Sequence, residues 1–343
     1  MSLSLLAIDV GGGTTEYLSY DESISPKNCP RMIVPSRTVL VAEQIREAGV
    51  KGRDVFLKGN LMGGGPSTKA AFAHIEKGFK VYSTPIAAKT LNDNLDRVRD
   101  RGVRIVEERP EEAVEIDLRD VDLEAVSASF KAMGVSLPQK YAVAVQDHGE
   151  SPSESNRRFR FRNWESFLKE GGSLKGLAFH DPPAHLTRML AVKRDLPGAI
   201  VADTGGAAIL GALEDEEVEE AAKGEGAILI NIGNFHTIAF LVRGERVLGL
   251  FEHHTGLLDR PKLEALIEKL KQGKLTNEEV FNDGGHGAAI ASDIPSGGFS
   301  FLAITGPGRG MAKGLGKFAS PHGDPMLAGC FGLVRAFKYL SNP

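Results

Sequence analysis

The chain has 343 residues, of which 42% are hydrophobic and 25% charged, and its formal net charge is −4. These values are typical of a globular protein of about two domains and argue against a disordered or fibrous chain. The negative charge gives no general attraction to nucleic acid or anionic lipid, and no stretch reaches the ~18 apolar residues of a membrane span. We therefore expect small-molecule partners, with no nucleic acid and no membrane.

The opening residues and the cysteine content indicate the compartment. Residues 1–8 lack a basic start, and their apolar run stops at Asp9, so we expect no signal peptide. Cys29 and Cys330 are too few for a disulfide framework or a cysteine-ligated iron–sulfur cluster. The sequence predicts a cytoplasmic protein.

The first half of the chain alternates apolar strands with helical patterns. Two strands are expected within residues 3–20, and further strands around 55–61, 80–82, 103–106 and 141–145. Apolar residues at helical spacing lie between them, in 37–48, 91–98 and 123–133. This alternation predicts a parallel or mixed sheet covered by helices.

A second series of strands follows the turn at residues 197–198. Strands are expected at 199–202, 226–231, 236–243, 246–253 and 300–305, and a long helix closes the chain. We place the domain boundary there, which gives an N-terminal domain 1–196 and a C-terminal domain 197–343. The alternating residues 157–162, Arg-Arg-Phe-Arg-Phe-Arg, are interpreted as an edge strand with outward arginines.

One glycine-rich turn occurs twice, as IDVGGGTTEYL at 8–18 and INIGNFHTIAFLV at 230–242. Glycines in such turns are expected to reach positive φ and to bring N–H groups to an anion. The repeat predicts two similar halves facing one phosphate-binding cleft, although a plain tight hairpin is the alternative. Asp9, at the end of the first strand, is the candidate Mg²⁺ ligand. The candidate phosphate-binding residues are Gly11, Gly12, Gly13, Thr14 and Thr15, with Gly233 and Asn234 facing them.

The order of these motifs resembles the superfamily of actin, Hsp70 proteins and sugar kinases. The two turns resemble its phosphate loops, ITGPGR at 304–309 resembles its adenosine loop, and residues 323–337 resemble the helix that follows. The resemblance implies an α/β fold of two ribonuclease-H-like domains with an interdomain nucleotide cleft. It also implies ATP and Mg²⁺ as cofactors, with Gly306 and Gly308 close to adenosine.

Two segments resemble the carbohydrate kinase branch more specifically. AVQDHG at 144–149 is similar to a strand end of those kinases, which implies that Gln146 and His148 contact substrate. ADTGGAAILGAL at 202–213 is similar to the segment with their catalytic aspartate. Asp203 is the candidate general base, although Thr204 occupies the position expected by spacing, and a helix N-cap is the alternative for both.

The sequence departs from those kinases in its second turn and adenosine loop. Asn231 stands where many members have aspartate, and Asn234-Phe235-His236 replaces small hydroxyl residues. Pro307 interrupts the adenosine loop. The altered second turn favours a nucleotide-dependent switch that activates a partner enzyme as an alternative to a kinase.

A second glycine-rich segment, LMGGGPSTKAAFAHIEKG at 61–78, reads as a turn followed by a helix from Pro66. Gly64, Gly65 and Ser67 are candidate ligands of a substrate phosphate or carboxylate, with an ordinary capped helix as the alternative. The chain, this segment included, is also similar to a prokaryotic family labelled as pyruvate formate-lyase activating enzyme. That label implies a three-cysteine cluster, which two cysteines cannot supply.

Eight of the nine histidines follow residue 147. Histidines in loops can converge on a transition metal, but no pair has the spacing of a helical zinc site. Hydrogen bonding in loops is the alternative.

The leading functional hypothesis is an ATP- and Mg²⁺-dependent phosphotransferase acting on a small hydroxylated metabolite. The nucleotide-dependent switch is one alternative, and a metal-dependent hydrolase built on the histidines is another. The expected partners are nucleotide and small-molecule substrate, and a protein partner or a second copy of the chain is left open.

Overall fold

The computed structural model describes residues 2–295 and 297–341 and contains three sheets. The first sheet has the strand order β3-β2-β1-β8-β10-β9. Its first three strands form an antiparallel meander, and β8 and β10 run parallel to β1. The strands are β1 (Ser4–Val10), β2 (Thr14–Asp21), β3 (Arg31–Pro35), β8 (Tyr141–Val145), β9 (Ala178–Phe179) and β10 (Ile200–Asp203).

The second sheet repeats this plan, with the order β14-β13-β12-β11-β15-β16. An antiparallel meander starts from β11, and β15 runs parallel to β11 on its other side. The strands are β11 (Ala227–Ile232), β12 (His236–Arg243), β13 (Arg246–His254), β14 (Gly287–Ile290), β15 (Phe301–Thr305) and β16 (Lys317–Phe318). The predicted α/β fold with two ribonuclease-H-like domains is confirmed.

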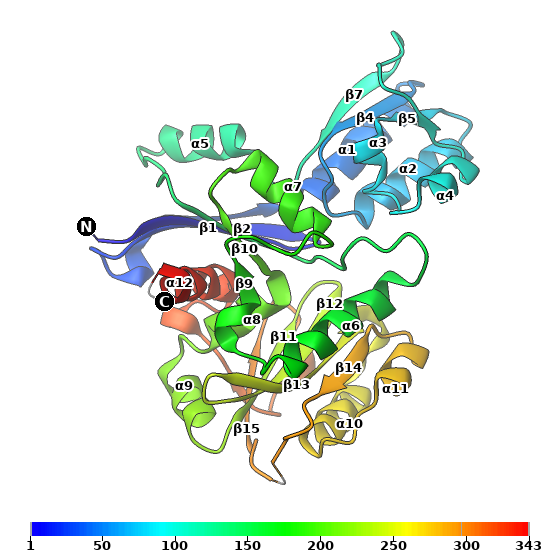
Figure 1. The fold of residues 1–343 in the computed structure, drawn as a ribbon. Helices are drawn as coiled ribbons and strands as arrows, with labels where there is room; N and C mark the ends of the chain where they lie inside the picture. The colour runs from blue at the N-terminus through cyan, green and yellow to red at the C-terminus, as the bar shows by residue number, and fades with distance from the viewer. Residues whose placement is uncertain (1, 296, 342–343) are drawn as a thin grey trace.

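A third, parallel sheet is inserted between β3 and β8, within the range predicted as one N-terminal domain. Its order is β6-β5-β4-β7, and it has its own apolar core. It forms the upper right part of Figure 1. The insertion comprises α1 (Arg37–Val50), β4 (Val55–Gly59), α2 (Pro66–Glu76), β5 (Val81–Ser83), α3 (Pro85–Ala88), α4 (Leu95–Asp100), β6 (Arg104–Ile105) and β7 (Val114–Leu118).

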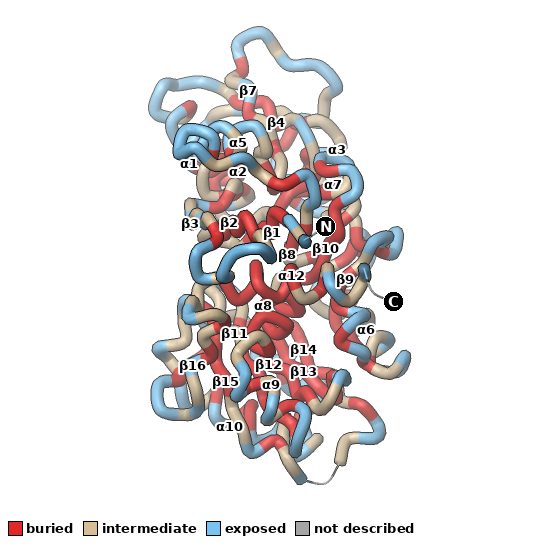
Figure 2. The backbone as a smooth tube through the Cα atoms, turned by 90° about the vertical axis from the view of Figure 1, so that its left-hand side faces the viewer, coloured by how far each residue is buried: buried red, intermediate tan, exposed pale blue. Residues whose placement is uncertain are grey.

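Two helices, α8 (Thr204–Ala212) and α12 (Ala328–Ser341), pack closely between the two large sheets (Figures 1 and 2). Glycines permit this contact, because a Cβ atom on Gly211 would lie 1.7 Å from the carbonyl oxygen of Ala328. One buried apolar cluster contains residues of both sheets and of both helices, for example Leu5 and Leu229. The two halves therefore share a core.

The other helices cover the sheets. They are α5 (Leu123–Ala132), α6 (Asn156–Lys169), α7 (Thr187–Asp195), α9 (Glu216–Lys223), α10 (Arg260–Lys271) and α11 (Asn277–Asn282). Short 3-10 helices lie at Pro26–Asn28, Leu174–Leu177, Thr255–Leu257, Arg309–Ala312, Pro321–Gly323 and Pro325–Leu327. Within the described residues, no helix is long and apolar enough to span a bilayer.

The interpretation of residues 157–162 as an edge strand is wrong, because they lie in α6. Phe161, Trp164 and Leu168 are buried along one side of this helix, and Arg160 is buried with them. Strand β10 follows the predicted boundary at 196/197 but pairs with β8 and β9 of the first sheet. The boundary itself stays a prediction.

Candidate functional site in the cleft

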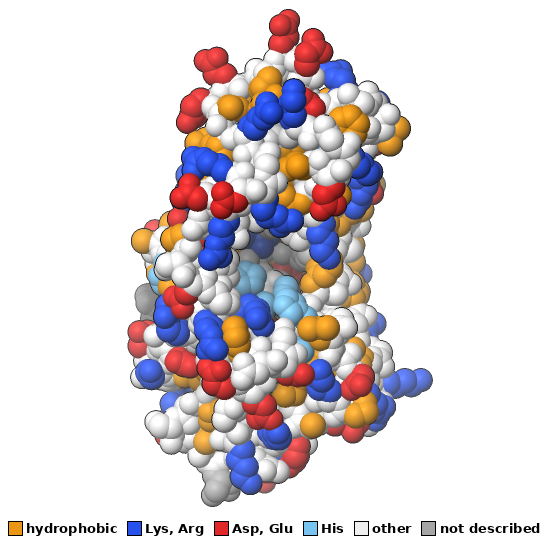
Figure 3. All heavy atoms as spheres, turned by 90° about the vertical axis from the view of Figure 1, so that its right-hand side faces the viewer, with side chains coloured by type: hydrophobic (Ala, Val, Ile, Leu, Met, Phe, Trp, Pro, Cys, Tyr) orange, Lys and Arg blue, Asp and Glu red, His pale blue; other side chains and the backbone are white. Residues whose placement is uncertain are grey.

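A cavity of about 1030 Å³ lies between the two halves and reaches the insertion. Figure 3 shows the hollow, with histidine side chains gathered in it. Gly11 of the β1–β2 turn and Gly233 of the β11–β12 turn both line it. The two copies of the turn therefore face one cleft, as the repeat predicts.

The two turns have the same backbone geometry. The N–H of Gly11 donates to the carbonyl oxygen of Thr14 at 2.9 Å, and the N–H of Gly233 donates to that of His236 at 2.9 Å. Both residue pairs are related by the same offset of 222 positions. His236 therefore occupies, in the second turn, the place that Thr14 occupies in the first.

A hydroxyl residue behind each turn holds its carbonyl groups. Ser36 donates from its backbone N–H and from Oγ to the first turn, at 3.0 Å in each case, and Thr255 donates from its N–H and Oγ1 to the second turn, at 2.9 Å. The acceptors are the carbonyl oxygens of Gly12 and Gly13 in the first turn and of Gly233 and Phe235 in the second. Neither hydroxyl residue was predicted, since neither lies in the repeated segment.

The backbone N–H groups of the turns are left free. Among the described residues, no acceptor pairs with the N–H of Gly12 or Gly13, nor with that of Asn234 or Phe235. Successive unpaired N–H groups in a turn form a positive concavity that suits phosphate. Three of these four residues, all but Gly13, line the cavity.

The prediction that the glycines of these turns reach positive φ is wrong. They are required because other atoms lie close to the backbone at these positions. None of Gly11, Gly12, Gly13 or Gly233 has a positive φ. Instead, a Cβ on Gly11 would lie 2.9 Å from a carbonyl oxygen, and one on Gly12 would lie 2.2 Å from the Phe235 ring. The turns leave no room for side chains at these positions.

Two carboxylates lie on the first turn. Oδ1 of Asp9 accepts a hydrogen bond from Oγ1 of Thr204 at 2.6 Å, and Glu16 accepts one from Thr14 at 2.6 Å. Burial, and then the charge of Glu16, raises the pKa of Asp9 to about 8. Asp9 and Glu16 both line the cavity, and such oxygen donors are the ligands that Mg²⁺ prefers.

Asp203 caps helix α8, which is the role given above as the alternative to a base. Its Oδ1 accepts from the N–H of Gly205 at 3.0 Å, and both of its oxygens accept from the buried Arg160. Arg160 also donates to Glu252 at 2.6 Å. Burial alone would lower the pKa of Arg160, but the charges of Asp203 and Glu252 hold it above its ordinary value. The base role of Asp203 stays a prediction.

The adenosine-loop glycines have different surroundings. Gly306 has φ +91°, and a Cβ there would lie 2.5 Å from Oδ1 of Asn231, so the loop lies against the end of β11. Gly306 lines the cavity together with Pro307. Gly308 instead packs on Ile232, and its N–H donates to the Ile232 carbonyl oxygen at 2.8 Å.

The glycine-rich turn before α2 reaches the cavity from the insertion. Gly65 has φ +73° at the N-cap, and Gly64, Gly65 and Lys69 line the cavity. Ser67 is buried, and its Oγ and N–H contact Oγ1 of Thr38 at 3.0 and 3.2 Å. Ser67 therefore stabilises the turn and does not face a ligand.

Twelve of the seventeen predicted site residues line the cavity. These are Asp9, Gly11, Gly12, Thr14, Gly64, Gly65, Gln146, His148, Thr204, Gly233, Asn234 and Gly306. Five others do not line it, namely Gly13, Thr15, Ser67, Asp203 and Gly308. Ser67, Asp203 and Gly308 are engaged in contacts within the protein, and only 1% of Thr15 is exposed.

Histidines contribute to the cavity wall beside the second turn. His148, His236 and His254 line the cavity. Burial lowers the pKa of all three, that of His236 to about 3, so their imidazoles are neutral at neutral pH. Of these, only His148 was predicted as a site residue.

The two sheet orders and the shared cleft define an actin-like ATPase fold. Residues 62–311 match a family described as "Putative pyruvate format-lyase activating enzyme (DUF1786)", and the chain belongs to this family. No curated protein matches the chain.

Three solved structures are similar to the chain at low identity. An exopolyphosphatase-like protein is 10% identical with TM-score 0.29, and the alignment covers 88% of this chain and 66% of that one. The ethanolamine utilization protein EutJ from Carboxydothermus hydrogenoformans is 10% identical with TM-score 0.31, covering 96% and 88%. A chain of the PilM-PilN type IV pilus biogenesis complex is 13% identical with TM-score 0.36, covering 98% and 99%.

The cysteines do not fit the iron–sulfur cluster that the family description implies. Cys29 and Cys330 are both buried and free, and Cys330 contacts the carbonyl oxygens of Ala7 and Glu16. Burial raises the pKa of the Cys330 thiol, whereas an iron ligand must be a thiolate.

Proposed function

We propose that the protein binds Mg-ATP in the cleft and transfers the terminal phosphoryl group to a small hydroxylated metabolite. The observation that carries this proposal is the pair of turns with matching hydrogen bonds that line one cavity, each with unpaired N–H groups. Backbone donors fixed in place before the ligand arrives stabilise phosphate charge without reorganisation.

The residues present fit Mg-ATP. The N–H groups of Gly12, Asn234 and Phe235 would bind phosphate oxygens, and the carboxylates of Asp9 and Glu16 would hold Mg²⁺. Mg-ATP, when bound, supplies the phosphoryl group and neutralises charge that develops on it. Thr204 orients Asp9 through their hydrogen bond. The adenosine would lie against the loop that contains Gly306, at the end of β11.

The metabolite would bind on the side of the insertion. Gln146 and His148 line the cavity, as do Lys69 and the turn before α2. A helix N-terminus beside a lysine attracts an anionic group of the substrate. A base role for Asp203 requires that substrate binding releases one of its oxygens from Arg160.

The nucleotide-dependent switch is the second candidate function. It is favoured by the engagement of both Asp203 oxygens and by Phe235 and His236 in place of small hydroxyl residues in the second turn. A switch needs nucleotide binding and domain closure but no base for a metabolite hydroxyl. The two candidates differ in what accelerates ATP turnover.

Nucleotide binding is tested first, by thermal shift and calorimetry with Mg-ATP and Mg-ADP. We expect Mg-ATP to stabilise wild type, because ligand binding raises apparent stability by mass action. Asp9→Asn should bind Mg-ATP at least ~10-fold more weakly, because it lacks one of the carboxylates proposed to hold Mg²⁺. Asp181→Asn, whose side chain is 96% exposed, is the matched control and should bind as wild type. The proposal fails if no adenine nucleotide binds to the wild-type protein.

Turnover is tested second, by following phosphate transfer and release with pools of sugars, polyols and hydroxy acids. A metabolite that raises ATP turnover, with loss of that stimulation in Asp203→Asn, supports the phosphotransferase. Stimulation by a protein fraction alone supports the switch and contradicts the phosphotransferase.

A further inference from the structure

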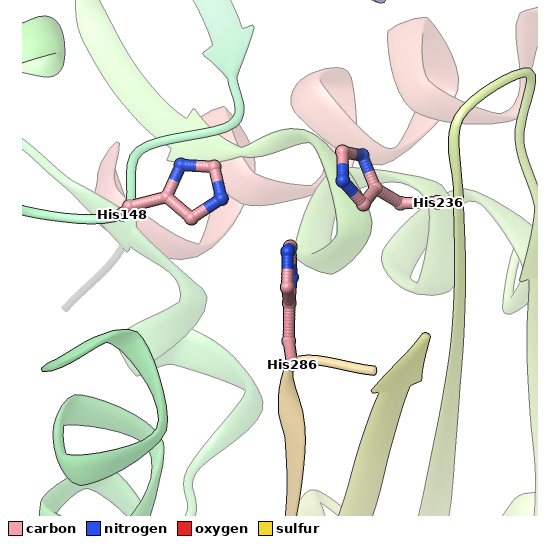
Figure 4. A group of neighbouring side chains, drawn as sticks. All are labelled: His148, His236 and His286. Atoms are coloured by element: carbon pink, nitrogen blue, oxygen red, sulfur yellow. The ribbon is translucent and has the colours of Figure 1, made fainter. Parts of the chain in front are cut away.

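Three histidines from distant parts of the chain meet beside the second turn. His148 follows β8, His236 begins β12, and His286 immediately precedes β14. Figure 4 shows their rings pointing toward one another from three sides. Convergence from separate elements is typical of a built site, since no local periodicity accounts for it.

The spacing of the three rings is close to that of a metal site. One ring nitrogen from each histidine lies within 4.8 Å of the other two. Three atoms at that separation lie at most about 2.8 Å from a common centre, whereas zinc–nitrogen bonds are 2.0–2.1 Å. Each nitrogen needs to move inward by about 0.7 Å, which small side-chain rotations supply.

A buried network of polar groups lies beside His286. Its side chain is 2% exposed, and its Nδ1 lies 2.9 Å from Oε1 of Glu252. Glu252 is held in turn by Arg160 and by Gln146, each at 2.6 Å. A carboxylate beside one ring nitrogen orients the other nitrogen toward a metal, as in carboxylate–histidine–zinc arrangements.

The ring nitrogens of His148 and His236 are available to a ligand. Within residues 2–295 and 297–341, the ring nitrogens of His148 and His236 form no hydrogen bond to a protein group. Both residues line the cavity, whereas His286 lies behind them. A metal held here would therefore keep a coordination position on the cavity side.

We propose that His148, His236 and His286 bind one divalent first-row transition metal ion, such as Zn²⁺, with an open position toward the cleft. Imidazole nitrogens suit zinc and its neighbours, and three protein ligands plus one exchangeable position is the arrangement of catalytic sites. The open position would take water or an anionic oxygen of the bound metabolite. The site shares no ligand with the carboxylates proposed for Mg²⁺, so it does not depend on nucleotide binding.

The test uses untagged full-length protein freed of metal by chelator dialysis and titrated with Co²⁺ and then with Zn²⁺. We expect one equivalent of Co²⁺, visible absorption bands of nitrogen-coordinated Co²⁺, and displacement of those bands by Zn²⁺. His148→Asn and His236→Asn should each weaken Co²⁺ binding by at least ~10-fold. His180→Asn alters an exposed histidine outside the cluster and should bind Co²⁺ as wild type.

Thermal melting checks that each variant is folded, and His148 and His236 decide the outcome if His286→Asn does not fold. Asp9→Asn should keep Co²⁺ binding while losing Mg-ATP, so failure of one site is distinguishable from failure of the other. Absence of stoichiometric binding by wild type, or unchanged binding in both His148→Asn and His236→Asn, overturns the metal site. Loss of Co²⁺ in Asp9→Asn would place the metal at the carboxylates instead.

Discussion

Gly12 and Phe235 meet across the cleft, since a Cβ atom on Gly12 would lie 2.2 Å from Cδ2 of the Phe235 ring. The two residues belong to opposite turns, 223 positions apart in the chain. Phe235 is 43% exposed, so its ring is not locked in a core. This contact makes the separation of the two turns depend on the absence of a side chain at residue 12.

Gly12→Ala is expected to push the Phe235 ring aside and to weaken Mg-ATP binding by ~10-fold. The free N–H groups of the two turns would then no longer point toward the same phosphate groups. The same substitution in a Phe235→Ala background should cost less, with a coupling of about 1 kcal/mol typical of residues in contact. Calorimetry on the four proteins of this double-mutant cycle measures the coupling. Equal effects in both backgrounds would show that the ring does not transmit the change.

Arg160→Met is expected to destabilise the protein by about 3–5 kcal/mol, because it leaves the buried carboxylates of Asp203 and Glu252 without their cation. Urea unfolding followed by circular dichroism measures the loss. Arg158→Met is the matched control on the same helix, where the arginine pairs with an exposed Glu278. The control should change the midpoint little because solvent screens that pair. A similar midpoint for both variants would contradict the importance of the buried network.

Gly332→Ala is expected to destabilise the contact between α8 and α12 by about 3 kcal/mol, since overpacking costs this much in close-packed helices. A Cβ on Gly332 would lie 1.8 Å from the carbonyl oxygen of Ala207, which cannot move without breaking the helix. Gly310→Ala is the control, because nothing lies within 4 Å of a Cβ there. The midpoints of urea unfolding should separate the two variants, and a harmless Gly332→Ala would show that the helices can move apart.

The sequence predicted the duplicated turn because a hairpin is formed by consecutive residues, which can be recognised in each copy. It did not predict the separate insertion, because strands and helices alternate along the chain in the inserted sheet as they do in the first sheet. The arginine-rich helix α6 was misread because Arg158–Arg162 alternates with period two over five residues. Extending the window to Trp164 and Leu168 reveals the period of a helix.

The candidate site was only partly predictable. Gly11 and Gly233 were found through their repeat, whereas Ser36 and Thr255 act from outside it. The partners of Asp203 could not be inferred, since Arg160 lies 43 residues away and reaches it through the tertiary fold. Long-range pairs of this kind depend on how helices pack and not on local spacing.

Arg335 of α12 is expected to make stability depend on pH in acid. It donates to Glu214 at 2.9 Å and to Glu219 at 2.7 Å. Burial would raise the pKa of Glu214, but hydrogen bonds from His322 and Arg335 outweigh it and lower this pKa. The Arg335 hydrogen bond lowers the pKa of Glu219 as well.

Because both carboxyl groups bind protons less readily in the folded state, their contribution is complete above the ordinary value of 4.5 and is lost as pH falls through the folded values. Arg335→Gln should therefore lose about 1 kcal/mol at neutral pH, after allowance for solvent screening, and should lose less further stability than wild type on acidification. Urea unfolding at neutral pH and at about pH 4 measures the difference. Arg99→Gln, which alters an exposed pair with Asp96, is the control and should change stability little at either pH. If wild type and Arg335→Gln lose the same free energy of unfolding on acidification, the prediction is wrong. Arg335 would then have no effect on the protonation of Glu214 and Glu219 in the folded state.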